Sequence, residues 1–138
     1  MLVIETILGG IAAVGVLSVY KNASDLSLRS FFAGTLTLAA LIYVGFALFG
    51  LVTGTASANW FLVELIGLAI YFAFAYLGFK KSAALLAVGW ALHVVWDLAF
   101  HSSGTVDFVP TFYPGVCLGF DLTFAAYIFY RFYLRYRN

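Results

Sequence analysis

The sequence predicts an all-α protein, an integral membrane bundle of five transmembrane helices. Hydrophobic residues make up 64% of the 138 residues, and the mean hydropathy is +1.04. Charged residues make up only 9%, whereas a soluble domain typically has about 25%. Five apolar stretches, each near the roughly 20 residues that cross the hydrocarbon core of a bilayer, occupy most of the chain.

The first expected span, residues 2–20, carries Glu5 and lacks the basic start of a signal peptide, so we expect it to be retained. A polar turn over residues 21–30 separates it from the second span. A short turn of small and polar residues, 54–59, precedes the third span, which ends at Lys80 and Lys81. The longest loop, 102–114, contains both prolines and separates the fourth span from the fifth. The second to fifth spans are expected at residues 31–53, 60–79, 82–101 and 115–133. At this length, residues 1–138 are expected to form one domain.

The basic residues predict the orientation of the bundle. With five spans, all seven fall on the same side: Lys21, Arg29, Lys80, Lys81, Arg131, Arg135 and Arg137. Because basic loops stay in the cytoplasm, this predicts the N-terminus outside and the C-terminus inside. The expected location is the cell membrane, as a multi-pass protein, with the bacterial inner membrane as the specific expectation.

Charge and cysteine content exclude several classes of function. The net charge is +1, and no basic face is present, so we expect no nucleic-acid partner. The single cysteine, Cys117, excludes an internal disulfide and every CxxC redox or zinc motif.

The fourth span contains the pattern that points to chemistry. His93, Asp97 and His101 are spaced i, i+4 and i+8, and at about 100° per residue they share one face of a helix. Charged side chains in hydrocarbon are costly, and they usually mark a functional site. This face is therefore expected to point into the bundle.

Two more carboxylates are expected at a similar depth. Glu64 lies about 6 Å below the outer end of the third span, and Asp121 lies about 9 Å into the fifth, at about 1.5 Å per residue. With His101 at the rim, and with Asp107 and Tyr113 in the loop above, a polar cavity open to the outside is expected. The candidate metal ligands are His93, Asp97, His101, Asp121 and Glu64, and mixed imidazole and carboxylate ligands suit zinc or iron.

Each of these residues also has a structural interpretation. His93 could join two helices by a hydrogen bond, His101 could be an interfacial residue, and Asp97 with Trp96 could be a polar clamp. Glu64 and Asp121 could be protonated and hold helices together. Gly115 and Gly119 form a GxxxG pattern, which fits either close helix packing or chance.

Three hypotheses about function follow. The first is an outward-facing site that binds a divalent metal and acts on a lipid-like small molecule, with the bilayer as its surroundings. The second is a small transporter or proton-coupled channel that uses the same residues as a relay. The third is an accessory subunit whose polar residues face a partner membrane subunit, or another copy in a homo-oligomer. Whether the chain is an enzyme is left open by the sequence.

The segment GWALHVVWDLAFH, residues 89–101, is followed by P-x-x-Y-P at residues 110–114 and by a Cys117-x-x-x-Asp121 pattern. This last third of the chain resembles small, uncharacterised bacterial integral membrane proteins with an HxxWDxxxH-type helix. The resemblance implies a membrane protein and implies no established activity. The His and acid groups are also loosely similar to those of intramembrane lipid-modifying enzymes.

Overall fold

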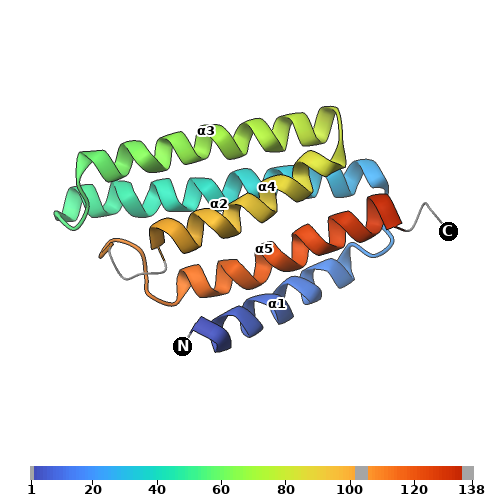
Figure 1. Ribbon diagram of the computed structural model, residues 1–138, viewed down its shortest axis with the longest axis horizontal. Coiled ribbons are helices and arrows are strands. Elements are labelled where there is room, and N and C mark those ends of the chain that lie inside the picture. Colours follow the sequence, from blue (N-terminus) through green and yellow to red (C-terminus); the bar gives the residue numbers. More distant parts are fainter. Residues whose placement is uncertain (1, 102–105, 135–138) are drawn as a thin grey trace.

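The computed structural model describes residues 2–101 and 106–134, which form helices joined by short connections (Figure 1). Successive α-helices run in alternating directions, so the chain crosses the length of the molecule five times (Figure 1). We call the end with residues 54–57 and 106–112 the loop end, and the end with residues 20–24 and 81–82 the basic end. The helices are α1 (Leu2–Val19), α2 (Asp25–Thr53), α3 (Ala58–Lys80), α4 (Ala83–Trp96) and α5 (Tyr113–Phe129), with π-helical segments η1 (Asp97–His101) and η2 (Tyr130–Leu134).

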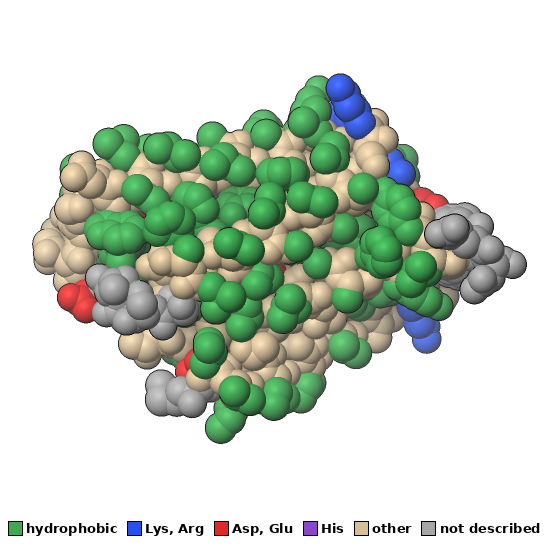
Figure 2. Space-filling model, in the orientation of Figure 1, with side chains coloured by type: hydrophobic (Ala, Val, Ile, Leu, Met, Phe, Trp, Pro, Cys, Tyr) green, Lys and Arg blue, Asp and Glu red, His purple; other side chains and the backbone are tan. Residues whose placement is uncertain are grey.

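Four segments are long and apolar enough to cross a membrane: α1, α2, α3 and the continuous segment Ala83–His101. The fifth helix, α5, has 17 residues and continues into η2. Figure 2 shows hydrophobic side chains spread over the visible face, with Lys and Arg gathered at the basic end. A multi-pass helical membrane protein is therefore supported, while the fifth span and the orientation remain predictions. Of the basic residues, Arg135 and Arg137 lie outside the described part.

The first turn is shorter than the sequence predicted. We expected a polar turn over residues 21–30, but α2 begins at Asp25. Ser24 caps this helix, because its side chain accepts a hydrogen bond from the backbone N–H of Ser27 at 3.2 Å. A serine cap satisfies one of the free N–H groups of the first helical turn and so allows the helix to start early. At its other end α2 stops at Gly54, whose φ of +80° is readily adopted only by glycine.

Helix α1 packs on α5 rather than along its sequence neighbour α2 (Figure 1). Gly9 and Gly119 lie where the two helices meet, and a Cβ atom at either position would overlap the backbone of the opposite helix. The GxxxG pattern of α5 is therefore used for close packing. Beside it, the Glu5 side chain packs on Gly115 in the first turn of α5, where a carboxylate is favoured by the positive end of the helix dipole.

The fourth helix is not a regular α-helix over its whole length. It changes to π-helical geometry at Asp97, so two of the predicted site residues, Asp97 and His101, begin and end η1. Single π-helical turns inside α-helices often occur at functional sites. The sequence analysis assumed an unbroken α-helix, and this difference places Asp97 and His101 in a wider turn than expected.

Candidate functional site

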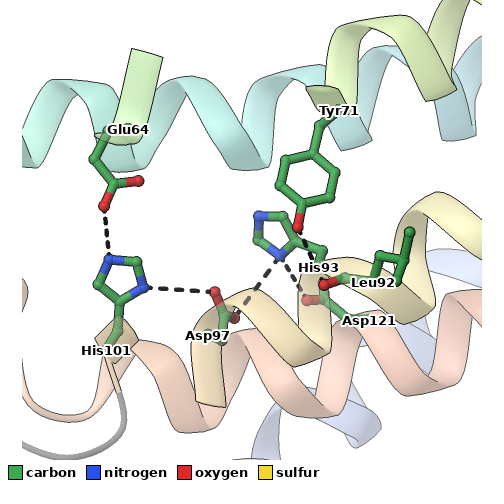
Figure 3. Close-up of polar contacts among 7 residues, drawn as sticks. All are labelled: Glu64, Tyr71, Leu92, His93, Asp97, His101 and Asp121. Atoms are coloured by element: carbon green, nitrogen blue, oxygen red, sulfur yellow. Dashed lines mark hydrogen bonds and ion pairs between the residues drawn. The ribbon is translucent and has the colours of Figure 1, made fainter. Parts of the chain in front are cut away.

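Five buried ionisable residues meet inside the loop-end half of the bundle (Figure 3). Glu64 comes from α3, His93 from α4, Asp97 and His101 from η1, and Asp121 from α5. We call these five residues the polar cluster. The helix face with His93, Asp97 and His101 points inward, as the i, i+4, i+8 spacing predicted. Even His101, the most exposed of the five, is only 5% exposed, so it lies inside the bundle, while its expected depth at the rim of the membrane stays a prediction.

The polar cluster is a chain in which carboxylates and imidazoles alternate. His101 donates from Nε2 to Glu64 Oε1 at 2.8 Å, and His93 donates from Nδ1 to Asp121 Oδ2 at 2.8 Å. Asp97 lies between these two pairs. Its Oδ2 is 3.8 Å from His93 Nδ1, and its Oδ1 is 4.0 Å from His101 Nδ1. The prediction that Asp97 lies near Asp121 together with a histidine is therefore confirmed.

Several buried atoms of the polar cluster have no hydrogen-bond partner among the described residues. They are both carboxylate oxygens of Asp97, Nε2 of His93 and Nδ1 of His101. A buried polar atom without a partner costs about 1–3 kcal/mol, and more when it is charged. Two of these atoms belong to Asp97 itself, so this carboxylate lacks a hydrogen bond of good geometry. Its candidate partners are the neighbouring hydroxyl of Tyr43, a cation, a proton and water.

A charge count identifies which carboxylate needs that partner. The cluster contains three carboxylates and two imidazoles. When both histidines are protonated, His101 neutralises Glu64, and His93 neutralises Asp121, because each pair is joined by a short hydrogen bond. The remaining carboxylate, Asp97, would keep an uncompensated negative charge in the interior of a membrane protein. Such a charge is costly, so Asp97 must bind a positive charge or take up a proton.

Three members of the polar cluster have the spacing of metal ligands. One ligand atom each from His93, Asp97 and Asp121 all lie within 4.8 Å of one another. In a tetrahedral zinc centre with bonds of about 2.0–2.2 Å, neighbouring ligand atoms lie about 3.4 Å apart. Small side-chain adjustments would bring the three atoms to that spacing. Glu64 and His101 are not part of this group, and Glu64 meets the cluster through His101.

Two tyrosines that the sequence analysis did not single out form the walls of the polar cluster. Tyr43 of α2 stacks on the ring of His101, with centroids 4.2 Å apart, and its buried hydroxyl lies beside Asp97 without a hydrogen bond of good geometry. Tyr71 of α3 contacts the ring of His93 edge-on at 4.8 Å and donates its hydroxyl to the carbonyl of Leu92 at 3.1 Å. Both tyrosines lie well inside their spans, away from the membrane interfaces where tyrosine is common. This unusual position is the sequence feature that could have identified them as site residues.

Hydrophobic side chains pack at the loop end of the bundle. Val106, Phe108 and Val109 are buried and pack with Tyr43 and Ala47 of α2. The described part of the connection between η1 and α5 thus buries hydrophobic side chains, and the expected polar cavity open to the outside stays a prediction. Asp107 is exposed in this connection, as expected of a loop residue. Tyr113 is the first residue of α5 rather than part of the loop.

The chain belongs to DUF6010, a family of unknown function whose sequence model matches residues 1–132. This match covers the polar cluster and all five α-helices. No curated protein and no solved structure matches the chain. Membership of a family of unknown function is consistent with the expected resemblance to uncharacterised proteins. The more specific resemblance to bacterial membrane proteins stays a prediction.

Proposed function

We propose that this protein is a multi-pass protein of the cell membrane that holds one divalent metal ion, zinc or iron, in the polar cluster. His93, Asp97 and Asp121 would be the ligands. The observation that carries the proposal is Asp97, a buried carboxylate whose two oxygens have no hydrogen-bond partner among the described residues. A divalent ion would neutralise Asp97 and Asp121 together, and the protonated His101 would neutralise Glu64, so the whole cluster would be electrically neutral.

Glu64 and His101 have a supporting role in this proposal. Metal sites commonly contain a carboxylate that holds and orients a neighbouring histidine, and these outer partners tune the affinity for the metal. His101 is held by Glu64 at 2.8 Å and turns its other nitrogen towards Oδ1 of Asp97 at 4.0 Å. The pair would thus orient Asp97, so that its other oxygen, Oδ2, points to His93 and the ion.

A site with three protein ligands has a fourth position for water or a substrate, which is the arrangement of catalytic rather than structural zinc. A metal there lowers the pKa of bound water or polarises an oxygen of the substrate. Because the polar cluster lies among apolar helices, the substrate we propose is a lipid-like small molecule.

A proton relay is the second candidate function, and the alternation of carboxylates and imidazoles favours it. A relay that crosses the membrane needs polar groups along the whole path. The buried side chains of the described residues in the basic-end half are apolar, including Leu28, Phe32 and Leu36. We therefore rank transport second. The accessory-subunit hypothesis ranks third, because the cluster faces the interior of its own chain and not a partner.

Metal analysis of the purified protein tests the proposal. The protein is to be loaded with zinc, or with iron(II) without oxygen, dialysed, and measured by elemental analysis. We expect stoichiometric metal in the wild type, a sharp loss in Asp97→Asn and His93→Ala, and no loss in Asp107→Asn. The last variant is the matched control, because it removes an exposed carboxylate near the same end of the bundle.

Folding of each variant is to be checked by size-exclusion chromatography and circular dichroism. Wild-type protein that retains neither metal after loading would refute the proposal. Asp97 would then have to be protonated, and the relay would become the leading hypothesis. Equal metal content in Asp97→Asn and the wild type would refute the assigned ligands.

A further inference from the structure

A cavity of about 350 Å³ reaches the polar cluster from the side of the bundle. It lies among α1, α2 and α5, and Trp90 of α4 contributes to its wall. Most of the lining is apolar, but one of the lining residues is Asp121, a member of the cluster. The cavity therefore connects the surface of the bundle with the candidate metal site.

The cavity opens towards lipid rather than towards water. It lies between α2 and the packed pair α1 and α5. Leu38, which is 53% exposed, lies at its rim in the middle of α2, a helix long and apolar enough to span a membrane. At the loop end, by contrast, the buried hydrophobic side chains of Val106, Phe108 and Val109 pack with α2. A molecule would therefore enter from the hydrocarbon layer.

The inner wall of this cavity offers an acceptor of hydrogen bonds. Asp121 provides carboxylate oxygens, and the aromatic side chains of Trp90, Phe120 and Phe124 line the cavity beside it. A carboxylate accepts hydrogen bonds and donates none when it is ionised. A polar group that enters the cavity beside Asp121 must therefore be a donor.

We propose that the cavity binds a single-chain lipid alcohol, with the hydroxyl beside Asp121 and the chain leaving past Leu38 into the bilayer. The proposal rests on the membrane location and the site of the proposed function, and it names the class of the lipid-like ligand. A hydroxyl is the simplest uncharged group that donates a hydrogen bond to a carboxylate.

Other lipid classes fit the cavity less well. A hydrocarbon or an ether lacks the donor that Asp121 needs. The volume lies at the small end of the roughly 300–1,000 Å³ of ligand pockets, which suits one chain rather than the two chains of a phospholipid.

Photo-crosslinking in phosphatidylcholine vesicles tests the inference. The probe is a hexadecanol with a diazirine in its chain, and its methyl ether, which lacks the O–H donor, is the matched probe. We expect the alcohol to label cavity residues roughly tenfold more than the ether, the preference expected for one hydrogen bond to a charged acceptor. Labelled peptides are identified by mass spectrometry and should come from α2 and α5 around the cavity.

A pair of variants tests the location. Ala39→Phe fills the cavity, because Ala39 of α2 lines it, and Ala73→Phe places the same ring on the exposed face of α3. We expect Ala39→Phe to lose the selective labelling and Ala73→Phe to keep it, with metal content unchanged in both. Equal labelling of the wild type by alcohol and ether would overturn the inference, whatever the variants do. So would selective labelling that survives in a folded Ala39→Phe.

The metal measurement separates the two proposals. Selective labelling of a protein that binds no metal would refute the proposed metal site and leave the alcohol site standing. A metal-loaded protein labelled equally by the two probes would refute the alcohol site alone.

Discussion

The two halves of the bundle bury opposite kinds of side chain. In the basic-end half the core contains Leu28, Phe32, Leu36, Leu86 and Ile128, each of them almost completely buried. In the loop-end half, α3, α4, η1 and α5 bury the five ionisable residues of the polar cluster. One half is thus built like an ordinary apolar core, while the other contains the groups that can bind or exchange charge.

The basic-end half should therefore contribute most to the stability of the fold, whereas the loop-end half contains the groups proposed to carry the chemistry. Apolar packing in the basic-end half gains free energy without regard to hydrogen-bond geometry, so its side chains need only fill space. The polar cluster is costly to bury and must be compensated by hydrogen bonds and counter-charges. Substitutions in the two halves should therefore affect different measurements.

The largest effect on stability is expected from Phe32→Ala in the basic-end half. Phe32 is fully buried and packs edge-on against Phe124 at 5.2 Å. Removing such a ring costs about 3–5 kcal/mol of the free energy of unfolding, because a cavity remains. Unfolding in detergent measures this loss, and Phe49→Ala, where the ring is 68% exposed, is the matched control. Metal content per folded chain should stay unchanged, and a loss of metal in folded Phe32→Ala would show that the halves are not independent.

A smaller and different effect is expected from Glu64→Gln in the loop-end half. The neutral amide would hold His101 less firmly and could not balance its charge. Substitutions of such outer partners lower metal affinity by roughly 10–100-fold. Competition with a chelator measures the affinity, and Glu5→Gln, outside the polar cluster, is the matched control. Unchanged affinity in Glu64→Gln would remove Glu64 and His101 from the proposed site.

The basic residues at one end of the bundle predict on which side of the membrane each half lies. In a variant without Cys117, a cysteine at Asp107 should react with a membrane-impermeant maleimide added outside, and a cysteine at Lys81 should not. The reason is the gathering of basic residues at one end. The reverse pattern would place the polar cluster in the inner leaflet and would contradict the five-span orientation.

The positions of the helices and the inward-facing residues of the fourth helix could be predicted, because they depend on the spacing of residues that are close in the sequence. The helix positions follow from the apolar stretches, and the inward face of His93, Asp97 and His101 follows from their spacing. The early start of α2 at Asp25 was missed, although Ser24 followed by Asp25 is itself a helix-start signal.

Other features depend on contacts between distant segments, and no local pattern reports them. The burial of Phe108 against Gly50 joins two segments that lie far apart in the sequence. The division of the five site residues into three candidate ligands and the pair Glu64–His101 depends on side-chain distances of a few ångströms. The cavity beside Asp121 is lined by residues of α1, α2, α4 and α5, which lie far apart in the sequence. Gly119 packs closely on α1, a partner helix that the GxxxG pattern did not name.

The central claim is that the loop-end half holds a metal ion between imidazole and carboxylate ligands, and X-ray absorption spectroscopy of the zinc-loaded protein tests it most directly. The account predicts a first shell of nitrogen and oxygen atoms at about 2.0–2.2 Å, with the outer-shell scattering of an imidazole that disappears in His93→Ala. A sulfur ligand from Cys117, or a first shell without imidazole in the wild type, would contradict it.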